Sequence, residues 1–581
     1  MLLPSSGAIN SNELLQPLLQ EILHEAELAR DNPLGILSYS LFCQFELNGD
    51  REQYQQVYFA RRGRLAACAI SALIDDNPQH IELLQETIWD ICNEYTWCLP
   101  AHLEGSPVPS EQTIDLFAAE TAHALAEILI LLQARMETSL AHRIRKEIDR
   151  RIFQPMCMDS VRFDWETADH NWASVCGGAV GMAAMLLIED KEQLTGILHR
   201  CIGAMESFLG GYGEDGGCAE GIGYWVYGFG YYVYFAEMLE VYSSGQWDLM
   251  NQDKVSAIAG YPEAVHLSDG VYANFSDAPE RVVLPTGLLS RLSARSGAPM
   301  PFPCIVPAFH DDPCYRWAHL SRNLWWTDEA CFGAQSKLGL QWLDNLGIVI
   351  DRRTVAGMNV AFSAKGGHNG EAHNHNDLGH FILHANGNNL LIDLGHGLYT
   401  KEYFREGRYE ILNNSSAGHS VPIINGAEQA TGEEYRATWL QLCELANGSE
   451  YRLDLSHAYP KSAGVHRYIR TYQWTTTAST CQLRLEDRFH FHHSSTHPYL
   501  VEERFISQLR PIISDEATVV EWTSGDTKLK LHYDTLQFTA QVQTVQHQDH
   551  AGNPITVYIT NLFAEYSEQD FLGVLEFTML S

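Results

Sequence analysis

The chain has 581 residues, which is too long for a single ordinary core, so we expect two or more domains. Apolar residues make up 45% of it, which excludes a disordered chain, and no apolar run is long enough to predict a membrane span. The formal net charge of −35 repels nucleic acid and anionic membrane surfaces, so we expect neither as a partner. A local basic pocket could still bind an anionic substrate.

The N-terminus and the cysteines indicate the compartment. The opening stretch "MLLPSSGAINSNELL" shows neither a basic segment nor a long apolar segment, so no signal peptide is visible. The 13 cysteines include no CxxC pair, which is typical of a reduced protein with buried thiols. We therefore expect a cytoplasmic protein, or a secreted or periplasmic one if a signal has been removed. The sequence leaves assembly into a homo-oligomer open.

The first half of the chain shows helical periodicity. From Ser110, in "SEQTIDLFAAETAHALAEILILLQARM", apolar residues recur every three or four positions, which predicts a helix. The same spacing predicts helices at 14–29, 81–95, 170–188, 195–209 and 223–241. Many helices without a fixed repeat favour an incomplete (α/α) toroid over residues 1–325.

The second half is strand-like. Apolar runs predict strands at 346–350, 358–364, 381–385, 390–394, 499–506, 556–562 and 574–579. Asn386-Gly387 lies between two of these runs and predicts a hairpin. We expect an antiparallel β-sandwich over residues 326–581, and an α+β multidomain fold for the whole chain.

The stretch "GEAHNHNDLGHF" (370–381) contains the densest group of histidines. If it is extended, His373 and His375 point to the same side, a spacing that suits a metal, or a metal ligand beside an acid or base. Downstream, Asp393 ends an apolar run and His419 lies in "SSAGHSVPIING". A His, Asp, His set with an open position is typical of a divalent metal on a β scaffold. The alternative is a turn whose polar groups bind one another.

Hairpin register complicates this grouping. With Asn386-Gly387 as a two-residue turn, Asp393 lies opposite His380 rather than His375. A bend at residues 377–379 is needed to bring His375 to Asp393.

Two further stretches lie in the helical half. "HNWASVCGG" places His170 and Asn171 at a helix start, where they could face a cleft or cap the helix. "EGIGYWVYGFGYY" follows a glycine-rich loop, and its tyrosines suit sugar stacking or acid–base work, although most are expected in the core. A second histidine cluster, "RFHFHHSSTH" (488–497), is interpreted as a solvated strand end.

With these motifs in this order, the chain resembles the heparinase II/III-like polysaccharide lyases. The resemblance rests on "EAHNHNDLGHFILHANGNNLLIDLGHGLYT" (371–400), supported by the two helical motifs. It implies β-elimination at a uronic acid of an anionic polysaccharide or oligosaccharide. Glycosaminoglycans such as heparan sulfate, chondroitin sulfate or hyaluronan are the first substrate class, and alginate or oligo-alginate is an alternative.

The resemblance also implies roles for single residues. Asn171 neutralises the substrate carboxylate, and His373 shares acid and base work with Tyr224 or Tyr227, of which Tyr224 is preferred. The implied metal ligands are His375, Asp393 and His419, for Zn²⁺ first and Mn²⁺ or Ca²⁺ otherwise. The implied substrate-binding residues are His170, Trp172, Glu220, Tyr399 and Arg405, with Arg408 as a second clamp for an anionic group.

Some features depart from the family pattern. His380 stands where a small residue is expected, and His396 is an extra imidazole near the site. Two other classes of protein remain as alternatives. One is an (α/α)-toroid glycoside hydrolase, which needs two carboxylates facing one cleft. The other is a non-catalytic sugar-binding protein.

Overall fold

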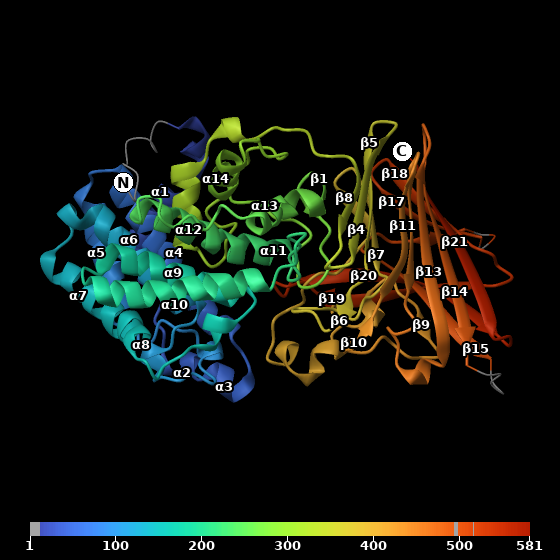
Figure 1. The fold of residues 1–581 in the computed structure, drawn as a ribbon, viewed down its shortest axis with the longest axis horizontal. Coiled ribbons are helices and arrows are strands. Elements are labelled where there is room, and N and C mark those ends of the chain that lie inside the picture. Colours follow the sequence, from blue (N-terminus) through green and yellow to red (C-terminus); the bar gives the residue numbers. More distant parts are fainter. Residues whose placement is uncertain (1–11, 493–497, 515, 517, 581) are drawn as a thin grey trace. The chain divides into compact units, whose positions relative to one another are not determined.

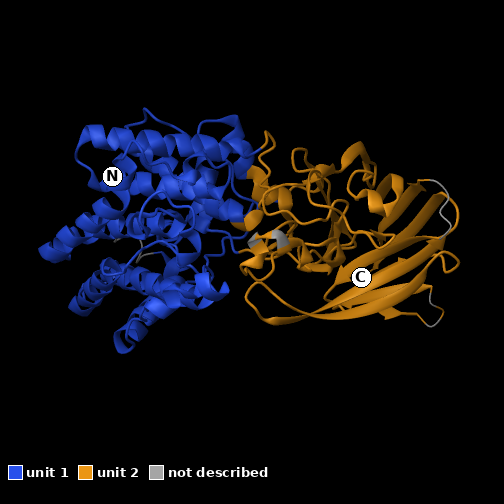
Figure 2. Cartoon of the chain, turned by 90° about the horizontal axis from the view of Figure 1, so that it is seen from below, with its two compact units in different colours: residues 1–212, 224–259, 283–335 blue, residues 213–223, 260–282, 336–581 orange. Residues whose placement is uncertain are grey.

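The computed structural model describes residues 12–492, 498–514, 516 and 518–580. It forms two compact units, each built from several stretches of chain (Figure 2). The first unit comprises 1–212, 224–259 and 283–335, and the second comprises 213–223, 260–282 and 336–581. Two short segments from the first half of the sequence therefore belong to the second unit.

The first unit is helical (Figure 1). Its longer helices are α1 (Gln16–Asp31), α4 (Glu52–Ile74), α5 (Pro78–Cys92), α6 (Leu116–Leu132), α7 (Thr138–Ile148), α9 (Asn171–Leu187), α10 (Lys191–Gly210), α12 (Gly230–Tyr242), α14 (Thr286–Ser296) and α15 (Trp317–Trp326). Short helices α2 (Tyr39–Phe42), α3 (Gln44–Asn48) and α8 (Gln154–Cys157) join them, while α11 (Ile222–Tyr224) and α13 (Asp253–Val265) contribute residues to both units.

The predicted helix at Ser110 begins later than expected. Residues Ser110–Gln112 form a 3₁₀ turn and α6 starts at Leu116. Asp115 fixes this start because its carboxylate accepts the backbone N–H of Ala118 at 2.8 Å and that of Leu99 at 3.1 Å. Residues Leu116–Arg135 are long and apolar enough to cross a membrane, but 78% of the most apolar window is buried inside the protein, as in a core helix.

The second unit consists of antiparallel sheets. Among the described residues, a five-stranded sheet contains β3 (Gly339–Leu343), β4 (Ile348–Val355), β5 (Met358–Lys365), β7 (Phe381–Ala385) and β8 (Asn388–Leu391). A four-stranded sheet contains β19 (Thr539–Gln548), β20 (Pro554–Tyr566), β15 (Tyr499–Ser507) and β9 (Ile423–Ile424). An eight-stranded sheet runs in the order β11 (Thr438–Leu445), β12 (Gly448–Asp454), β13 (Val465–Thr476), β14 (Cys481–Phe491), β21 (Asp570–Leu580), β18 (Thr527–His532), β17 (Val519–Ser524) and β16 (Ile512–Ile513).

One apolar core joins these three sheets. Phe362 and Phe381 of the five-stranded sheet pack with Tyr472 of the eight-stranded sheet and Phe505 of the four-stranded sheet. The strands predicted from apolar runs are all present, within a few residues at their ends. Sequence reasoning missed β11–β14 and β17–β19, whose outward positions are polar, as in the alternating burial of β14.

The hairpin predicted at Asn386-Gly387 is present. Both residues have positive φ, 46° and 74°, as a type I′ turn requires. Pairing begins as Ala385 opposite Asn388, and a bulge then shifts Leu383 opposite Leu391. Asp393 lies two residues beyond the end of β8.

Candidate active site and metal centre

The histidine stretch is a loop rather than the extended segment expected from its sequence. Residues 370–380 form turns between the short strand β6 (His368–Asn369) and β7. His373 has φ 55°, a left-handed conformation that few non-glycine residues adopt, and such strain clusters at functional sites. The predicted bend is confirmed, because Gly379 has φ 84° and His380 N–H bonds to the carbonyl of Asp377 at 2.8 Å.

This bend brings together the predicted metal ligands. One nitrogen or oxygen from each of His375, Asp393 and His419 lies within 4.8 Å of the others, and all three residues are buried. The distance from His375 Nδ1 to His419 Nε2 is 3.3 Å, and that from His419 Nε2 to Asp393 Oδ2 is 3.6 Å. A tetrahedral ion with bonds of 2.0–2.2 Å separates its ligand atoms by about 3.3–3.6 Å, so the spacing fits zinc.

The hydrogen bonds made by the ring nitrogens of His419 and His375 that face away from the cluster are compatible with a bound cation. His419 Nδ1 donates to the carbonyl of Ser415 at 2.7 Å, so Nε2 presents a lone pair. His375 Nε2 lies 3.0 Å from a carboxylate oxygen of Asp277, which leaves Nδ1 as a lone pair facing His419. Two lone pairs and a carboxylate that converge in this way repel one another, and either a bound cation or a proton on His419, whose pKa Asp393 raises, relieves the repulsion. Asp393 Oδ2 accepts no hydrogen bond, as expected of a ligand atom.

His380 lies beside this set but is not one of its ligands. Its Nδ1 accepts the backbone N–H of Ser420 at 2.8 Å, so the proton is on Nε2, which lies 3.4 Å from Asp393 Oδ2 without forming a hydrogen bond. Burial lowers the pKa of His380 to about 3, so the ring is neutral. Asp393 Oδ2 is close to both candidate partners, 3.4 Å from His380 Nε2 and 3.6 Å from His419 Nε2, although the bulge in the hairpin shifts the register that placed Asp393 opposite His380.

Asp277 is the central residue that sequence reasoning missed. Its buried carboxylate accepts His373 Nδ1 at 2.7 Å and His375 Nε2 at 3.0 Å. Burial alone would raise the pKa of Asp277, but these two hydrogen bonds and the charge of Arg408 hold it well below its usual range. The carboxylate is therefore ionised, and it fixes which nitrogen of each ring carries the proton.

The outward nitrogen of His373 is the group available for proton transfer. With Nδ1 bound to Asp277, Nε2 lies 3.4 Å from Glu220 Oε1, and the side chain is 23% exposed. A histidine whose inner nitrogen is held by a buried carboxylate is a common acid–base arrangement. The predicted residues Glu220, His373 and His375 therefore lie together.

Tyr399 and Arg405, the other predicted substrate-binding residues of this unit, differ in exposure. Tyr399 is half-buried, and its ring packs against His550 and Tyr403 with centroid separations of 4.6 and 4.8 Å. Arg405 is exposed, as expected of a clamp for an anionic group. Arg408 contradicts that expectation, because its guanidinium donates to Asp277 and to the carbonyl of Asn374, each at 3.0 Å.

The second histidine cluster is only partly described. Its residues 493–497 lie outside the described residues. His490 is 42% exposed and lies opposite Asp570 on β21, which its Nδ1 approaches to 2.9 Å. This is an exposed strand end, in agreement with the interpretation from sequence.

The remaining predicted residues lie in the helical unit. His170 is the N-cap residue of α9 and Asn171 is its first residue, so the helix-start prediction is confirmed. Asn171 packs against the π-helical turn Trp225–Phe229 at Gly228, where a Cβ would come within 3.2 Å of Asn171 Cα. Trp172 is half-buried beside His102. The structure thus places Asn171 next to the turn that follows Tyr224.

The two candidate tyrosines differ in their surroundings. Tyr224 is half-buried at the end of α11. Tyr227 is buried, and the guanidinium of Arg316 lies 4.0 Å from its ring centroid. Burial and the nearby Glu120 raise the pKa of Tyr227 well above its usual range, which disfavours the phenolate that a base requires. These contacts favour Tyr224 for proton transfer.

A buried lysine supports the histidine loop from behind. Lys365 Nζ lies 2.9 Å from Asp377 and 3.8 Å from Glu371, the residues at the two ends of the loop. It also approaches Ser276, the neighbour of Asp277, at 3.5 Å. Burial alone would lower the pKa of Lys365, but the carboxylates of Asp377 and Glu371 raise it above its usual value. In the sequence, this residue could have been noticed as a lysine at the end of the apolar run that forms β5.

Glu371 predicts a pH-dependent stability. Burial raises its pKa to about 7, against an ordinary value of 4.5. The folded state therefore holds this proton more tightly than the unfolded state, and stability falls as pH rises between these two values. We expect the Glu371→Gln variant to lose about 3 kcal/mol of this pH dependence, as measured by urea unfolding at pH 5 and pH 8.

The exposed Glu568 provides the control, because Glu568→Gln should follow the wild type at both pH values. Glu120, whose pKa burial also raises to about 7, contributes equally to wild type and variants and cancels in the difference. Equal pH dependence in wild type and Glu371→Gln would contradict this account.

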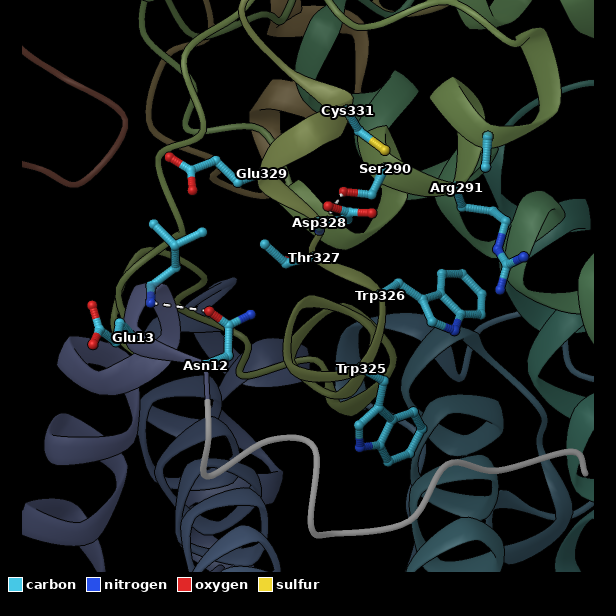
Figure 3. Close-up of a pocket in the computed structure, with 12 residues that line it drawn as sticks. Asn12, Glu13, Ser290, Arg291, Trp325, Trp326, Thr327, Asp328, Glu329 and Cys331 are labelled. Carbon is cyan, nitrogen blue, oxygen red and sulfur yellow. Dashed lines mark hydrogen bonds between the residues drawn. The ribbon is translucent and has the colours of Figure 1, made fainter.

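A cavity in the helical unit lies apart from these residues (Figure 3). It has a volume of about 630 Å³ and is lined by residues that include Trp325, Trp326, Arg291, Asp328 and Glu329. The Arg291 guanidinium lies 4.7 Å from the centroid of Trp326, so one aromatic face is already covered. The cavity contains none of the predicted site residues, and we assign it no part in the chemistry.

Comparison with known proteins identifies the class. Residues 329–546 match the family described as Heparinase II/III-like, C-terminal. This match confirms, for this part of the chain, the resemblance inferred from the sequence motifs. A search of curated proteins finds no match.

Solved structures share the whole fold. Heparan sulfate lyase HepC from Pedobacter heparinus aligns with a TM-score of 0.64 and 12% identity, over 100% of this chain and 86% of that chain. The structure described as "Heparinase III-BT4657 gene product" aligns with a TM-score of 0.63 and 12% identity, over 97% and 85%. At this identity the likeness shows the fold, and it confirms the predicted toroid followed by a β-sandwich.

Proposed function

We propose that this protein is a polysaccharide lyase that cleaves uronic-acid-containing polysaccharide by β-elimination. The observation that carries the proposal is His373, whose Nδ1 is held by buried Asp277 while Nε2 faces outward beside Glu220. This residue lies on the loop of a domain whose family is named for heparinases. The likeness to structures named heparan sulfate lyases supports a glycosaminoglycan as the first substrate class.

The reaction breaks one C–O bond without water. A base removes the proton at C5 of the uronate, the electron pair forms the C4=C5 double bond, and the bond from C4 to the bridging oxygen O4 breaks. A proton donor then protonates O4 as it leaves. The C5 proton becomes acidic enough only when the adjacent carboxylate is neutralised by hydrogen bonding.

We assign these tasks to the residues predicted from the sequence. Asn171 supplies an uncharged amide donor for the carboxylate at the start of α9. His373 Nε2 and the hydroxyl of Tyr224 are the pair that removes and supplies protons. His170, Trp172, Tyr399 and Arg405 are assigned to substrate binding.

The experiment that tests the function follows the new double bond by its ultraviolet absorbance. The purified chain is offered heparan sulfate, chondroitin sulfate, hyaluronan and alginate in parallel. A rise with at least one polymer supports elimination, and the polymer that reacts names the substrate. New reducing ends without a rise in absorbance would refute the lyase proposal in favour of a glycoside hydrolase. Binding without either signal would favour a sugar-binding protein.

We further propose that His375, Asp393 and His419 hold one divalent ion, with zinc first and manganese or calcium as alternatives. When bound, the ion supplies a fixed positive charge that joins the histidine loop to the residues after β8 and to His419. We expect the chelator-stripped chain to bind one equivalent of zinc in calorimetric titration. His419→Ala should abolish this binding, while His457→Ala, at an exposed histidine, should not. A stripped wild type that takes up no divalent ion would refute the site.

A further inference from the structure

The Asp277 carboxylate accepts four hydrogen bonds, two at each oxygen. Oδ1 accepts His375 Nε2 at 3.0 Å and the hydroxyl of Tyr403. Oδ2 accepts His373 Nδ1 at 2.7 Å and Arg408 Nη2 at 3.0 Å. The side chain has no exposed surface. All the positions at which a carboxylate can accept a hydrogen bond are therefore occupied by protein groups.

This arrangement dictates the proton positions of two different imidazoles. Each neutral ring has one N–H, and both rings must direct it at Asp277, because a carboxylate only accepts. The opposite nitrogens then carry lone pairs. In His375 that nitrogen is Nδ1, 3.3 Å from His419 Nε2 within the proposed metal site. In His373 it is Nε2, on the side of Glu220.

We propose that Asp277 is a positioning residue that couples the metal site to the acid–base histidine by fixing the ring tautomers of His375 and His373 through one carboxylate. The role given to His373 rests on the proposed lyase function, whereas the effect on metal binding does not. The carboxylate holds both rings at once, so a displacement of either ring must move the hydrogen bond that orients the other. The ion thereby determines how His373 is presented to substrate.

Replacing Asp277 by asparagine tests this reasoning because an amide has one accepting and one donating end. If the amide oxygen faces His373, the amide N–H₂ faces His375 Nε2, and the proton of that ring moves to Nδ1, where it blocks the metal. If the amide is turned round, His375 keeps its lone pair for the metal, but His373 must carry its proton on Nε2. Asparagine therefore cannot satisfy both rings in the form that the carboxylate imposes.

The experiment compares the full chain with its Asp277→Asn, Asp277→Glu and Tyr403→Phe variants. Zinc affinity is measured by calorimetry on stripped protein, and kcat and KM are measured with and without zinc on the polymer that the wild type cleaves. We expect Asp277→Asn to lose 10–100-fold in zinc affinity, Asp277→Glu to lose less because it restores a carboxylate, and Tyr403→Phe to stay within about threefold of the wild type. KM should change less than kcat in Asp277→Asn.

Coupling between the proposed metal site and His373 is tested separately, by the effect of zinc removal on kcat. Removing zinc should lower kcat in the wild type but have little further effect in Asp277→Asn, because the link is already broken. Equal zinc affinity in wild type and Asp277→Asn, or additive effects of zinc removal and the substitution on kcat, would overturn the proposal. If the wild type cleaves no polymer, the lyase proposal fails while the zinc affinities still decide whether Asp277 positions the metal ligand. Should Asp277→Asn prove too unstable to measure, an Asp277→Ala variant with the zinc affinity of the wild type would equally overturn it, because alanine has no carboxylate to fix the tautomer of His375.

Discussion

His373→Asn should lower kcat by about 10²–10⁴-fold, the usual contribution of a general acid or base, while leaving zinc affinity close to that of the wild type. Asparagine is chosen because it tolerates the left-handed backbone at φ 55° better than alanine does. Its amide can still donate a hydrogen bond to Asp277, but it has no ring nitrogen to exchange a proton with substrate. The measurement is the initial rate of double-bond formation on the polymer that the wild type cleaves.

The control for this variant is His457→Ala, which removes an exposed histidine far along the chain and should leave kcat unchanged. Melting temperature and zinc affinity are measured beside the rate to separate lost chemistry from a disordered loop. A His373→Asn variant that retains more than about a tenth of the wild-type kcat would remove His373 from the acid–base pair.

Arg470→Met should lower the free energy of unfolding by about 3–5 kcal/mol, the cost of leaving a buried charge without its partner. The Arg470 side chain is fully buried and donates twice to Asp487 and once to Glu503, each at 2.8 Å. Burial and Asp487 raise the pKa of Glu503 well above its usual range, so Asp487 is the charge left unpaired. Arg470 also donates to the carbonyls of Gly379 and Ser420, at 3.0 and 2.9 Å.

Those last two bonds connect the core to the proposed metal site, because Gly379 makes the bend and Ser420 follows His419, a proposed ligand. The variant should therefore weaken zinc binding as well as stability. Arg484→Met on β14 is the matched control: Arg484 is 41% exposed, pairs with Glu576 at 3.0 Å, and should contribute no more than about 1 kcal/mol. Similar urea midpoints for Arg470→Met and Arg484→Met would contradict the assignment.

The sequence predicted the parts of the site that lie close together in the chain. His373, His375 and the bend at Gly379 belong to one loop, and a hairpin returns Asp393 toward it. Hairpin register alone favoured His380 as the neighbour of Asp393, so the predicted ligand set came from the family resemblance. Asp277 could not be found in this way, because it lies 96 residues before His373 and its surroundings in "NFSDAPER" show no local pattern. Only a folded chain reveals which carboxylate occupies such a position.

Element boundaries failed for a different reason. The helix predicted from Ser110 begins at Leu116 because Asp115 binds both its own helix and Leu99, a contact from outside the window that periodicity uses. In the eight-stranded sheet, β21 was predicted, but β11–β14, β17 and β18 were missed because strands were sought as apolar runs. In β13, "VHRYIRTYQWTT", apolar residues alternate with polar ones, which is typical of a strand with one buried face.

The chain passes between the two units several times, which limits how the proposed site could be transferred to another protein by recombination. All three proposed metal ligands lie after residue 336, but Glu220 and Asp277 reach the same unit from segments 213–223 and 260–282. A gene fragment that encodes residues 336–581 would carry the proposed ligands without Asp277, the carboxylate proposed to orient His375. The site therefore cannot pass to another protein as one contiguous cassette. Recombination that preserves the site should therefore keep these segments together and in their present order along one chain.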